Sequence, residues 1–382
     1  MGEYNNNRER VQPIKRAASK KNRSKAVLDL IEDHVSYKSH AKMCNCYNYI
    51  KGMLDVNYDK LRVLDAFACK NRFCPICAAI KSRNDATMIS MIMDYLKGEI
   101  RAEFMVLTLT MPNVTGGQLV WAINKLNKAF YKMFKRKVIK QINLGYARKL
   151  EITYNSDKII TEDMWNGTGR YTGRPMAAYY SKRGLRIGDP NPNYDTYHPH
   201  FHVIIAVSPG YIHGGKYVHQ NKWLEQWRDV MDDDTITQVD IRRMFKRHYK
   251  PGTEVREVAK YAAKDSDYTG RQVVEHIEGE VKYRNRVKAQ DVFDCFYTAL
   301  KSRQVLTFNG CFKEALKLYK NEELEEYRPT DETVYAWVIR YGWVGNKYSE
   351  RSRRTLTLDE TYGNFGIPMF VEDEDEPGIT WD

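Results

Sequence analysis

The chain has 382 residues, 42% of them hydrophobic, which is enough for one large or two modest domains with a real core. No apolar run approaches the roughly 20 residues that span a bilayer, and the first residues lack the apolar stretch of a secretory signal, so we expect a cytoplasmic protein without a membrane segment. The formal net charge is +12, and removing the six acidic residues of positions 371–382, a segment without Lys or Arg, leaves +18 on the rest, which favours a polyanionic partner bound through phosphate contacts.

The N-terminal segment is basic and poor in apolar residues. Residues 1–25 are rich in Asn, Lys and Arg and hold almost no large apolar side chains. Such a segment has too little apolar surface to offset the entropy of ordering. We therefore predict a disordered basic arm over residues 1–25.

Cysteines are concentrated in the next segment. Five of the seven fall between residues 44 and 77: Cys44, Cys46, Cys69, Cys74 and Cys77. In a cytosolic chain such clustering points to zinc rather than to disulfides, and four thiolates hold a small segment that has little core of its own. Cys69, Cys74 and Cys77 are the surer ligands, and either Cys44 or Cys46 completes the set. We predict a cysteine-rich zinc module over residues 26–85; free buried cysteines are the alternative.

The segment that follows the cysteines alternates between helical and strand patterns. Periodic apolar residues predict helices, and alternating or continuous apolar runs predict strands. A stretch rich in Gly, Pro, Asn and Tyr reads as an insertion. In chain order, the expected elements are a helix from Ala86 to about Leu96, a strand over 103–110, a helix over 117–140, a strand at 148–154 and the insertion at 155–196.

The strand at 198–207 carries a candidate metal site. Successive side chains of a strand face opposite ways, so His200 and His202 share a face with Cα atoms roughly 7 Å apart. Two imidazoles that close chelate a divalent ion, and the apolar run that follows them indicates a rigid interior strand. The alternative is a pair of ordinary strand histidines.

A third metal ligand is expected from a neighbouring strand. Two imidazoles leave a hard cation such as Mg²⁺ or Mn²⁺ short of oxygen ligands. Glu151 lies in the alternating strand at 148–154, which is expected to pair with the histidine strand. We predict Glu151 as this ligand; a solvent-facing strand glutamate is the alternative.

A later segment combines a carboxylate, a phenol and an ammonium. Residues 256–268 predict a helix, because Ala, Glu and Lys dominate and neither Pro nor Gly interrupts. Helix residues three and four apart are neighbours, so Glu257, Tyr261 and Lys264 lie along one face. A positioned phenol attacks a polarised phosphodiester to form a phosphotyrosine link, and Lys264 is placed to hold the scissile phosphate. The alternative is a solvated helix face.

The remaining elements complete the expected fold. Helices at 219–231 and around a short strand at 305–308, together with a strand at 235–241, predict an α+β fold in which helices cover an antiparallel sheet. We assign residues 86–325 to this domain, with 286–322 as an accessory part. Residues 326–382 form a C-terminal extension that ends in the acidic tail, which we expect to be disordered.

Three ordered segments resemble the motifs of rolling-circle plasmid replication initiators, members of the HUH endonuclease superfamily that use a single tyrosine. The segments are residues 103–114, 198–202 and 257–264, and the likeness extends over roughly residues 40–315. The run from Cys69 to Cys77 also matches a cysteine-rich stretch of relatives. The resemblance implies an HUH endonuclease-like fold.

The resemblance also implies a mechanism. Family members hold Mn²⁺ or Mg²⁺ through two histidines, here His200 and His202. The tyrosine of the third motif, here Tyr261, nicks one strand at the double-strand origin, keeps the 5′ phosphate and leaves a 3′ hydroxyl for a polymerase. The glutamate one turn earlier, here Glu257, activates water at termination. Tyr268, seven residues after Tyr261, is the alternative second nucleophile.

The resemblance also implies partners, and two rival functions stay open. The implied partners are plasmid origin DNA, exposed as a single strand or hairpin at the nick site, and a host helicase and polymerase. A transposase or relaxase of the same superfamily would use the same histidines and tyrosine. Fold alone does not separate these functions from an initiator. A non-catalytic, zinc-dependent DNA-binding regulator is a third possibility, in which the histidines are structural.

Overall fold

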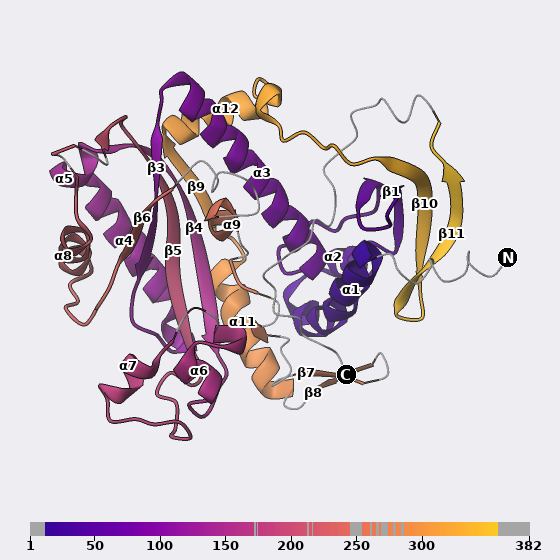
Figure 1. Cartoon of the computed structure of the whole chain (residues 1–382). Coiled ribbons are helices and arrows are strands. Elements are labelled where there is room, and N and C mark those ends of the chain that lie inside the picture. The colour runs from indigo at the N-terminus through magenta and orange to yellow at the C-terminus, as the bar shows by residue number, and fades with distance from the viewer. Residues whose placement is uncertain are drawn as a thin grey trace.

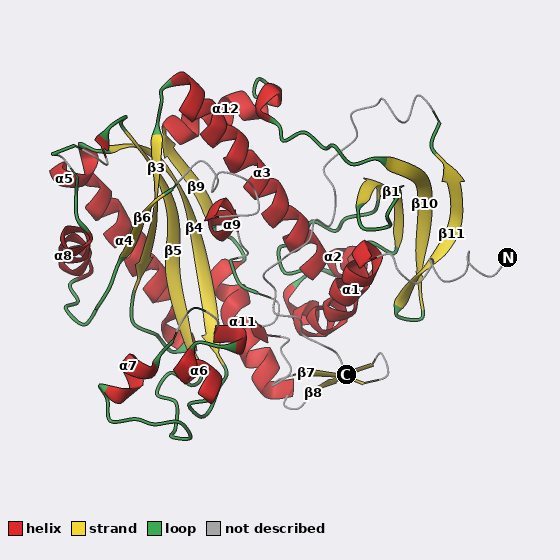
Figure 2. Ribbon diagram, in the orientation of Figure 1, coloured by secondary structure: helices red, strands yellow, loops and turns green. Residues whose placement is uncertain are grey.

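A computed structural model of the chain describes most of residues 12–357. Outside the described residues lie 1–11 and 358–382 and, within the range, 172, 174, 212–213, 216, 245–253, 260–261, 265–266, 269–273, 278–279 and 284–285. The predicted α+β class is confirmed, since antiparallel sheets and helices build the described part (Figures 1 and 2).

A five-stranded antiparallel sheet forms the centre of the molecule. Its order is β6 (Asp240–Arg243), β3 (Glu103–Thr110), β5 (Thr196–Val207), β4 (Asn143–Asn155) and β9 (Leu306–Gly310). The predicted strands at 103–110, 148–154 and 198–207 are therefore adjacent in space. The strand expected at 235–241 begins only at residue 240. The strand expected at 305–308 is an edge strand of this sheet, not part of an accessory unit.

The register of the sheet decides which residues meet. Thr108 of β3 and Lys149 of β4 both lie opposite His202 of β5, and Glu151 lies opposite His200. Side chains of a strand alternate between faces, so these five polar residues share one face, whereas Phe201, Val203 and Ile205 point to the other. The central strand is thus apolar on one side and changes from apolar to polar along the other.

Helices cover both faces of the central sheet. On one face lie α4 (Leu119–Lys135), the short α5 (Lys137–Lys140), which the extended Arg136 separates from α4, and α8 (Gln220–Met231). Phe130 of α4 packs against Phe201 at a ring distance of 5.5 Å. On the other lie α3 (Pro75–Glu99), α9 (Glu254–Ala259) and α12 (Cys311–Lys320) (Figure 1). The helices predicted at 117–140 and 219–231 are confirmed, the first as α4 and α5, but the helix expected from Ala86 already begins at Pro75.

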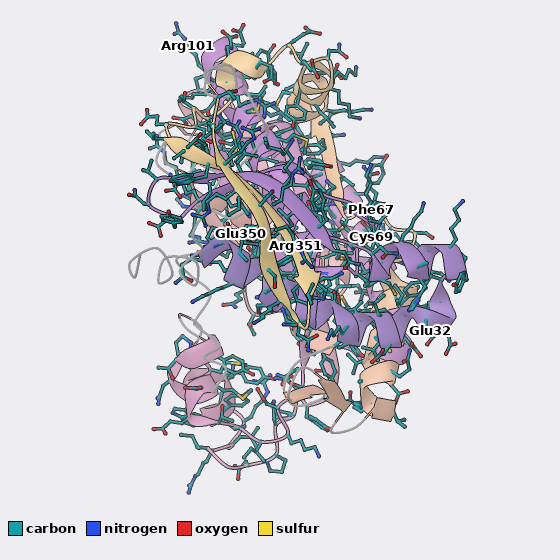
Figure 3. All side chains as sticks on the ribbon, turned by 90° about the vertical axis from the view of Figure 1, so that its right-hand side faces the viewer. Glu32, Phe67, Cys69, Arg101, Glu350 and Arg351 are labelled. Carbon is teal, nitrogen blue, oxygen red and sulfur yellow. The ribbon has the colours of Figure 1, made fainter. Side chains whose placement is uncertain are left out.

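The segments at the two ends of the described chain build a second sheet together. Strands β1 (Tyr49–Asp55) and β2 (Leu61–Asp65) pair with β10 (Tyr335–Val344) and β11 (Lys347–Thr355) in the order β11-β10-β1-β2. Figure 3 views this part from the front, with Glu350 and Arg351 on β11. The expected division between a module at 26–85 and an extension from 326 therefore does not describe the structure, because both contribute to one sheet.

The N-terminal prediction is wrong for residues 12–25. These residues belong to helix α1 (Gln12–Ile31), which is followed by α2 (Tyr37–Cys44). Small and apolar residues such as Ile14, Ala17 and Val27 are buried, and the ammonium of Lys21 is buried as well. The basic composition concealed an apolar stripe that α1 buries against the rest of the molecule. Residues 1–11 and the acidic tail lie outside the described residues.

Three smaller parts complete the description. The insertion holds α6 (Glu162–Asn166) and α7 (Ala177–Ser181) around a small core of Ile160, Met164 and Tyr180. A hairpin of β7 (Val274–Ile277) and β8 (Glu280–Tyr283) precedes α11 (Arg286–Leu300), which packs against α4 and α1. Among the described helices, none is long and apolar enough to cross a bilayer.

Candidate functional site

Two histidines and a glutamate converge on the polar part of the central sheet. The Oε2 atom of Glu151 lies 3.0 Å from Nε2 of His202 and 3.4 Å from Nε2 of His200. All three side chains are buried, at 6–7% exposure, and their ligand atoms lie within 4.8 Å of one another. The sequence expectation that these residues come together is met, because β4 and β5 pair in the register that sets Glu151 opposite His200.

The second nitrogen of each imidazole is also held. Nδ1 of His200 lies 3.1 Å from the carbonyl oxygen of His198, which only accepts, so this nitrogen donates. Nδ1 of His202 lies 3.3 Å from Oγ1 of Thr108. Outer contacts of this kind orient metal-binding imidazoles and fix their tautomer. They direct both Nε2 atoms toward Glu151.

This donor set calls for a cation. Neutral His200, which donates through Nδ1, offers only a lone pair at Nε2, so this nitrogen and the carboxylate of Glu151 would face one another as acceptors. A bound proton or a metal ion between them relieves that conflict. The mixture of two nitrogens and one oxygen fits a divalent ion such as Mn²⁺ or Mg²⁺ that takes its remaining ligands from water or phosphate. Because the described residues supply only three ligands, positions for a substrate oxygen would stay open.

Electrostatics at Glu151 favour its charged form. Burial by itself would raise the pKa of this carboxyl group, but hydrogen bonds with His200 and His202 outweigh burial and hold the pKa well below its ordinary value. Glu151 is therefore a carboxylate at neutral pH, as a metal ligand must be.

A buried ion pair lies beside the three ligands and was missed by sequence reasoning. Lys149, opposite His202 on β4, places its Nζ 3.3 Å from Oδ2 of Asp85 on α3, and Lys81 also contacts Asp85. Burial lowers the pKa of Lys149, an effect that Asp85 opposes. The signal was present in the sequence, because Lys149 alternates in step with Glu151 and therefore had to share its face.

The segment around the predicted nucleophile is anchored on both sides. Tyr261 and Lys260 lie outside the described residues, and so does the side chain of Glu257, although its backbone belongs to α9. Before them, Oγ of Ser82 on α3 donates a 2.8 Å hydrogen bond to the carbonyl of Ala259. After them, the carbonyl of Ala262 accepts a 2.8 Å hydrogen bond from the N–H of Ile152, the residue next to Glu151. Lys264 is exposed.

Tyr268 has a different environment from the one expected of a nucleophile. Its side chain is 2% exposed. The ring packs against Phe73, Phe293 and Phe296 at centroid distances of 6.4, 5.3 and 5.7 Å. In this arrangement Tyr268 is a core residue that joins the nucleophile segment to α11.

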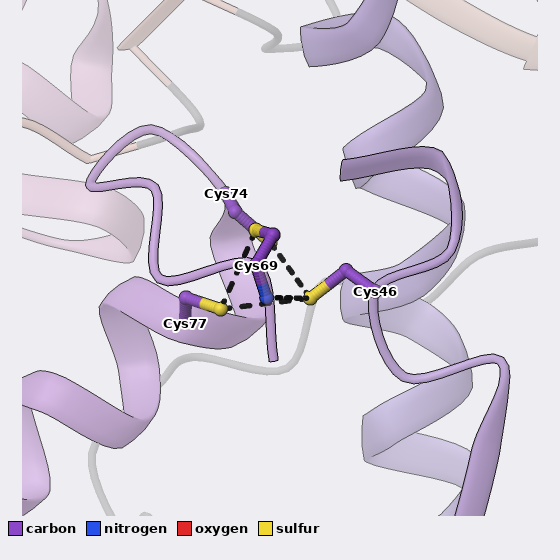
Figure 4. A group of neighbouring side chains, drawn as sticks. All are labelled: Cys46, Cys69, Cys74 and Cys77. Carbon is purple, nitrogen blue, oxygen red and sulfur yellow. Dashed lines mark hydrogen bonds between the residues drawn. The ribbon is translucent and has the colours of Figure 1, made fainter. Parts of the chain in front are cut away.

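Four of the five clustered cysteines form a second candidate metal site (Figure 4). The Sγ atom of Cys46 lies 3.5 Å from that of Cys77 and 3.7 Å from that of Cys74, and Cys69 lies 3.6 Å from Cys77. A tetrahedral site with zinc–sulfur bonds of about 2.3 Å would separate its sulfur atoms by about 3.8 Å. The spacing therefore fits zinc. Cys44 is exposed and lies outside the group, so Cys46 is the fourth member.

The cysteine cluster draws on the turn after α2, the loop after β2 and the start of α3. Cys46 follows α2, Cys69 lies in the loop after β2, Cys74 is the N-cap of α3, and Cys77 lies in its first turn. Hydrogen bonding with Cys46 lowers the pKa of the Cys69, Cys74 and Cys77 thiols. A buried ammonium is also close, since Lys21 of α1 donates to the carbonyls of Cys44 at 3.1 Å and Cys46 at 2.5 Å. This positive charge offsets part of the negative charge that four thiolates would concentrate.

Comparison with known proteins gives a consistent result. A family model described as Replication protein matches residues 60–348. A protein named Protein rep from Staphylococcus aureus is 34% identical over 256 residues, which cover 67% of this chain and 95% of the relative. Proteins of the same name from a Bacillus species and from Streptococcus pneumoniae are 29% and 27% identical over 73% and 69% of this chain, and 80% and 67% of their own lengths.

No solved structure shows a significant similarity to this chain. The family match nevertheless covers well over half of the sequence, including both candidate metal sites apart from Cys46. The chain belongs to the Replication protein family, and is a member of the rolling-circle plasmid replication initiators that its motifs resemble.

Proposed function

We propose that this initiator is an HUH-type nicking endonuclease, with Tyr261 as nucleophile and His200, His202 and Glu151 as ligands of Mn²⁺ or Mg²⁺. The observation that carries the proposal is that two Nε2 atoms and one carboxylate oxygen, from strands β5 and β4, lie close together. Ile152, the residue after the ligand Glu151, donates its N–H to the carbonyl of Ala262, the residue after Tyr261. A divalent ion bound there would polarise the scissile phosphate and stabilise developing negative charge.

The two anchors support this role for Tyr261. Ala259 and Ala262 are three residues apart, and consecutive Cα atoms are only about 3.8 Å apart. One anchor is on α3 and the other is on β4 beside Glu151, so the intervening chain has a short reach from the candidate metal ligands. A segment anchored at both ends supports the role of Tyr261, because a weak nucleophile such as a phenol needs to be held in position.

In the proposed nicking step, Oη of Tyr261 forms a bond to phosphorus while the bond from phosphorus to the 3′ oxygen breaks. The phenol loses its proton, and the 3′ oxygen gains one to become a hydroxyl. Lys264, exposed near the end of the nucleophile segment, would contact the non-bridging phosphate oxygens. The products are a 5′-phosphotyrosine link and a 3′ hydroxyl that primes the host polymerase, with a host helicase separating the strands.

To end a replication cycle, the phosphotyrosine link must be broken, and in the proposed mechanism water attacks it rather than the end of a second DNA strand. We propose that Glu257 accepts a proton from a water molecule, which attacks the phosphotyrosine and returns Tyr261 to its free form. Glu257 precedes Tyr261 by four positions in the sequence. The helix expected over 256–268 is described only as far as Ala259, where α9 ends, and α9 packs against α3 through the buried Val255, Val258 and Ala259. Buried Tyr268 would need to leave its aromatic neighbours to act instead.

The test is adduct formation on an origin oligonucleotide. Wild-type protein incubated with Mn²⁺ and labelled single-stranded origin DNA should give a protein–DNA adduct that survives denaturation, and Tyr261→Phe should give none. Glu257→Ala should form the adduct but fail to release it by hydrolysis. Reversible binding without any adduct would instead support a DNA-binding regulator. Efficient transfer to a second strand, without hydrolytic release, would support a transposase or relaxase.

We also propose that the cysteine cluster holds a structural zinc ion. Four sulfur atoms at nearly tetrahedral spacing and the absence of a described oxygen ligand among them fit a closed site of this kind. Such an ion would link the turn after α2 to the start of α3, beside buried apolar residues such as Met43 and Ile76.

A further inference from the structure

Helix α4 presents a surface that the proposed nicking reaction does not use. Its apolar residues, including Leu126 and Phe130, are buried against the face of the central sheet opposite to His200 and His202. The other side of the helix carries two aromatic residues and four lysines. We call this set the α4 lysine face: Trp121, Lys125, Lys128, Tyr131, Lys132 and Lys135.

The members of the α4 lysine face lie in one stripe. At 3.6 residues per turn, each residue is rotated by about 100° from the one before. The six residues therefore fall within an arc of about 120°, opposite to the buried residues of the helix. Lys125 is half-buried and the other five are exposed, with Trp121 at 56% and Tyr131 at 60%.

The charge of this surface is of one sign. Helices α4 and α5 together contain no Asp or Glu. Acidic residues do occur on α8, which packs against α4, but Asp229 contacts Arg136 and Glu225 contacts Lys222. A run of lysines without acidic partners in its own helix is the electrostatic pattern of a phosphate-binding surface.

The aromatic rings suggest which nucleic acid fits. Lys125 lies over the ring of Trp121 at 5.5 Å, and Lys135 lies over the ring of Tyr131 at 4.1 Å. Exposed rings next to cations bind unpaired bases, which stack on the ring while the phosphate reaches the ammonium. The bases of a duplex are already stacked and offer no such face. The two pairs of an aromatic residue and a lysine are ten residues apart and span about 15 Å along the helix, so one strand can contact both.

The position of the face relates it to the candidate active site. Residues 111–118 connect the end of β3, where Thr110 lies opposite His200, to the start of α4. This connection is tied to β5 by the bridge between Val114 and Tyr197. Trp121 therefore lies at the N-terminal end of α4, which follows directly on the connection from β3, the strand next to His200 and His202.

We propose that the α4 lysine face binds single-stranded DNA that flanks the nick site. Trp121 and Tyr131 stack on unpaired bases, and the lysines contact the phosphates between them. The inference rests on the proposed function, because it takes the strand that is nicked at the metal site as the strand that continues onto α4.

The test compares binding of the full-length protein to a labelled single-stranded oligonucleotide of mixed sequence and to the matching duplex, over a range of salt concentrations. Replacing two phosphate contacts by Lys128→Gln with Lys132→Gln should weaken single-strand binding and reduce the log–log salt slope by about 1.4. Trp121→Ala should weaken single-strand binding on the order of tenfold, with little effect on that slope. The matched control is Lys313→Gln with Lys320→Gln, two exposed lysines of α12, which should leave both quantities unchanged.

Three results would overturn this inference. They are single-strand binding unchanged in the α4 variants, an equal loss in the α12 control, or a loss confined to the duplex with no effect of Trp121→Ala. Adduct formation on a short oligonucleotide that contains only the nick site is measured in parallel. If wild type forms the adduct but the α4 variants bind normally, only the inference about α4 fails; if wild type forms no adduct, the proposed function itself fails.

Discussion

The N–H of Ile152 donates a 2.8 Å hydrogen bond to the carbonyl of Ala262. Strand β9 pairs with β4 only as far as Lys149, so Ile152 lies at an edge that the chain after α9 occupies instead. One strand therefore carries the candidate ligand Glu151 and, one residue later, the attachment of the proposed nucleophile segment. This relationship gives the mechanism its geometry, and neighbouring contacts give it measurable consequences.

Removing the hydroxyl of Thr108 should loosen metal binding without removing a ligand. Thr108→Val keeps the shape of the side chain but leaves Nδ1 of His202 without its 3.3 Å partner. Loss of such an outer contact typically lowers metal affinity by about 10- to 100-fold. Titration of Mn²⁺ followed by electron paramagnetic resonance should show this decrease, and Thr108→Ser should restore affinity. Unchanged Mn²⁺ affinity in Thr108→Val would contradict this orienting role.

Removing the hydroxyl of Ser82 should slow nicking while metal binding stays intact. Ser82→Ala deletes the hydrogen bond that holds the carbonyl of Ala259 on α3. We expect about 1 kcal/mol less stability and slower adduct formation at saturating Mn²⁺, because the nucleophile segment loses one anchor. Single-turnover rates and Mn²⁺ affinity separate the two effects. Ser90→Ala, a buried serine two turns later on α3, is the control and should nick normally; a slower rate in that control would contradict the positioning role.

Glu151 should make stability depend on acidic pH. Its folded-state pKa lies well below the ordinary value of 4.5, so its contribution is complete above about pH 4.5 and is lost as pH falls through the lower, folded-state value. With a chelator present to keep the protein metal-free, Glu151→Gln should lower the free energy of unfolding by about 1.5–3 kcal/mol just above pH 4.5. Urea unfolding at successive pH values should show the two proteins converging as the solution becomes more acidic. Parallel curves would contradict the assignment.

The cysteine cluster should contain one zinc ion per chain, held by Cys46, Cys69, Cys74 and Cys77. Cys74→Ser with Cys77→Ser should lose the metal and unfold at a lower temperature, because the site joins segments distant in sequence. Elemental analysis of the purified protein measures the metal. Cys44→Ser is the matched control and should retain it. Metal-free wild-type protein would refute the assignment.

The candidate metal site could be predicted because its signal is local. Alternation along a strand placed His200 and His202 on one face, and the same rule put Glu151 on the adjacent strand in a compatible position. Pairing between strands β4 and β5 required only that two long apolar strands be neighbours. The choice between Cys44 and Cys46 could not be made in this way, since it depends on how the chain turns after α2, where Tyr47 adopts a positive φ of 53°.

Other features depend on contacts between distant segments and escaped prediction. The pairing of β1 with β10 joins residues nearly 300 positions apart, and neither strand is marked by its own pattern as the partner of the other. Residues 12–25 look disordered by composition alone, because their apolar residues are few and their burial is provided by other parts of the fold. The composition of a segment does not reveal which distant parts of the chain will cover its apolar residues.

Helix α3 begins at the cysteine cluster and reaches Ser82 five residues after Cys77. Each residue of a helix turns the chain by about 100° and advances it by about 1.5 Å. One inserted or deleted residue between Cys77 and Ser82 would therefore swing the serine hydroxyl away from α9, even if every side chain were kept. Related initiators should therefore keep the length of this short stretch constant.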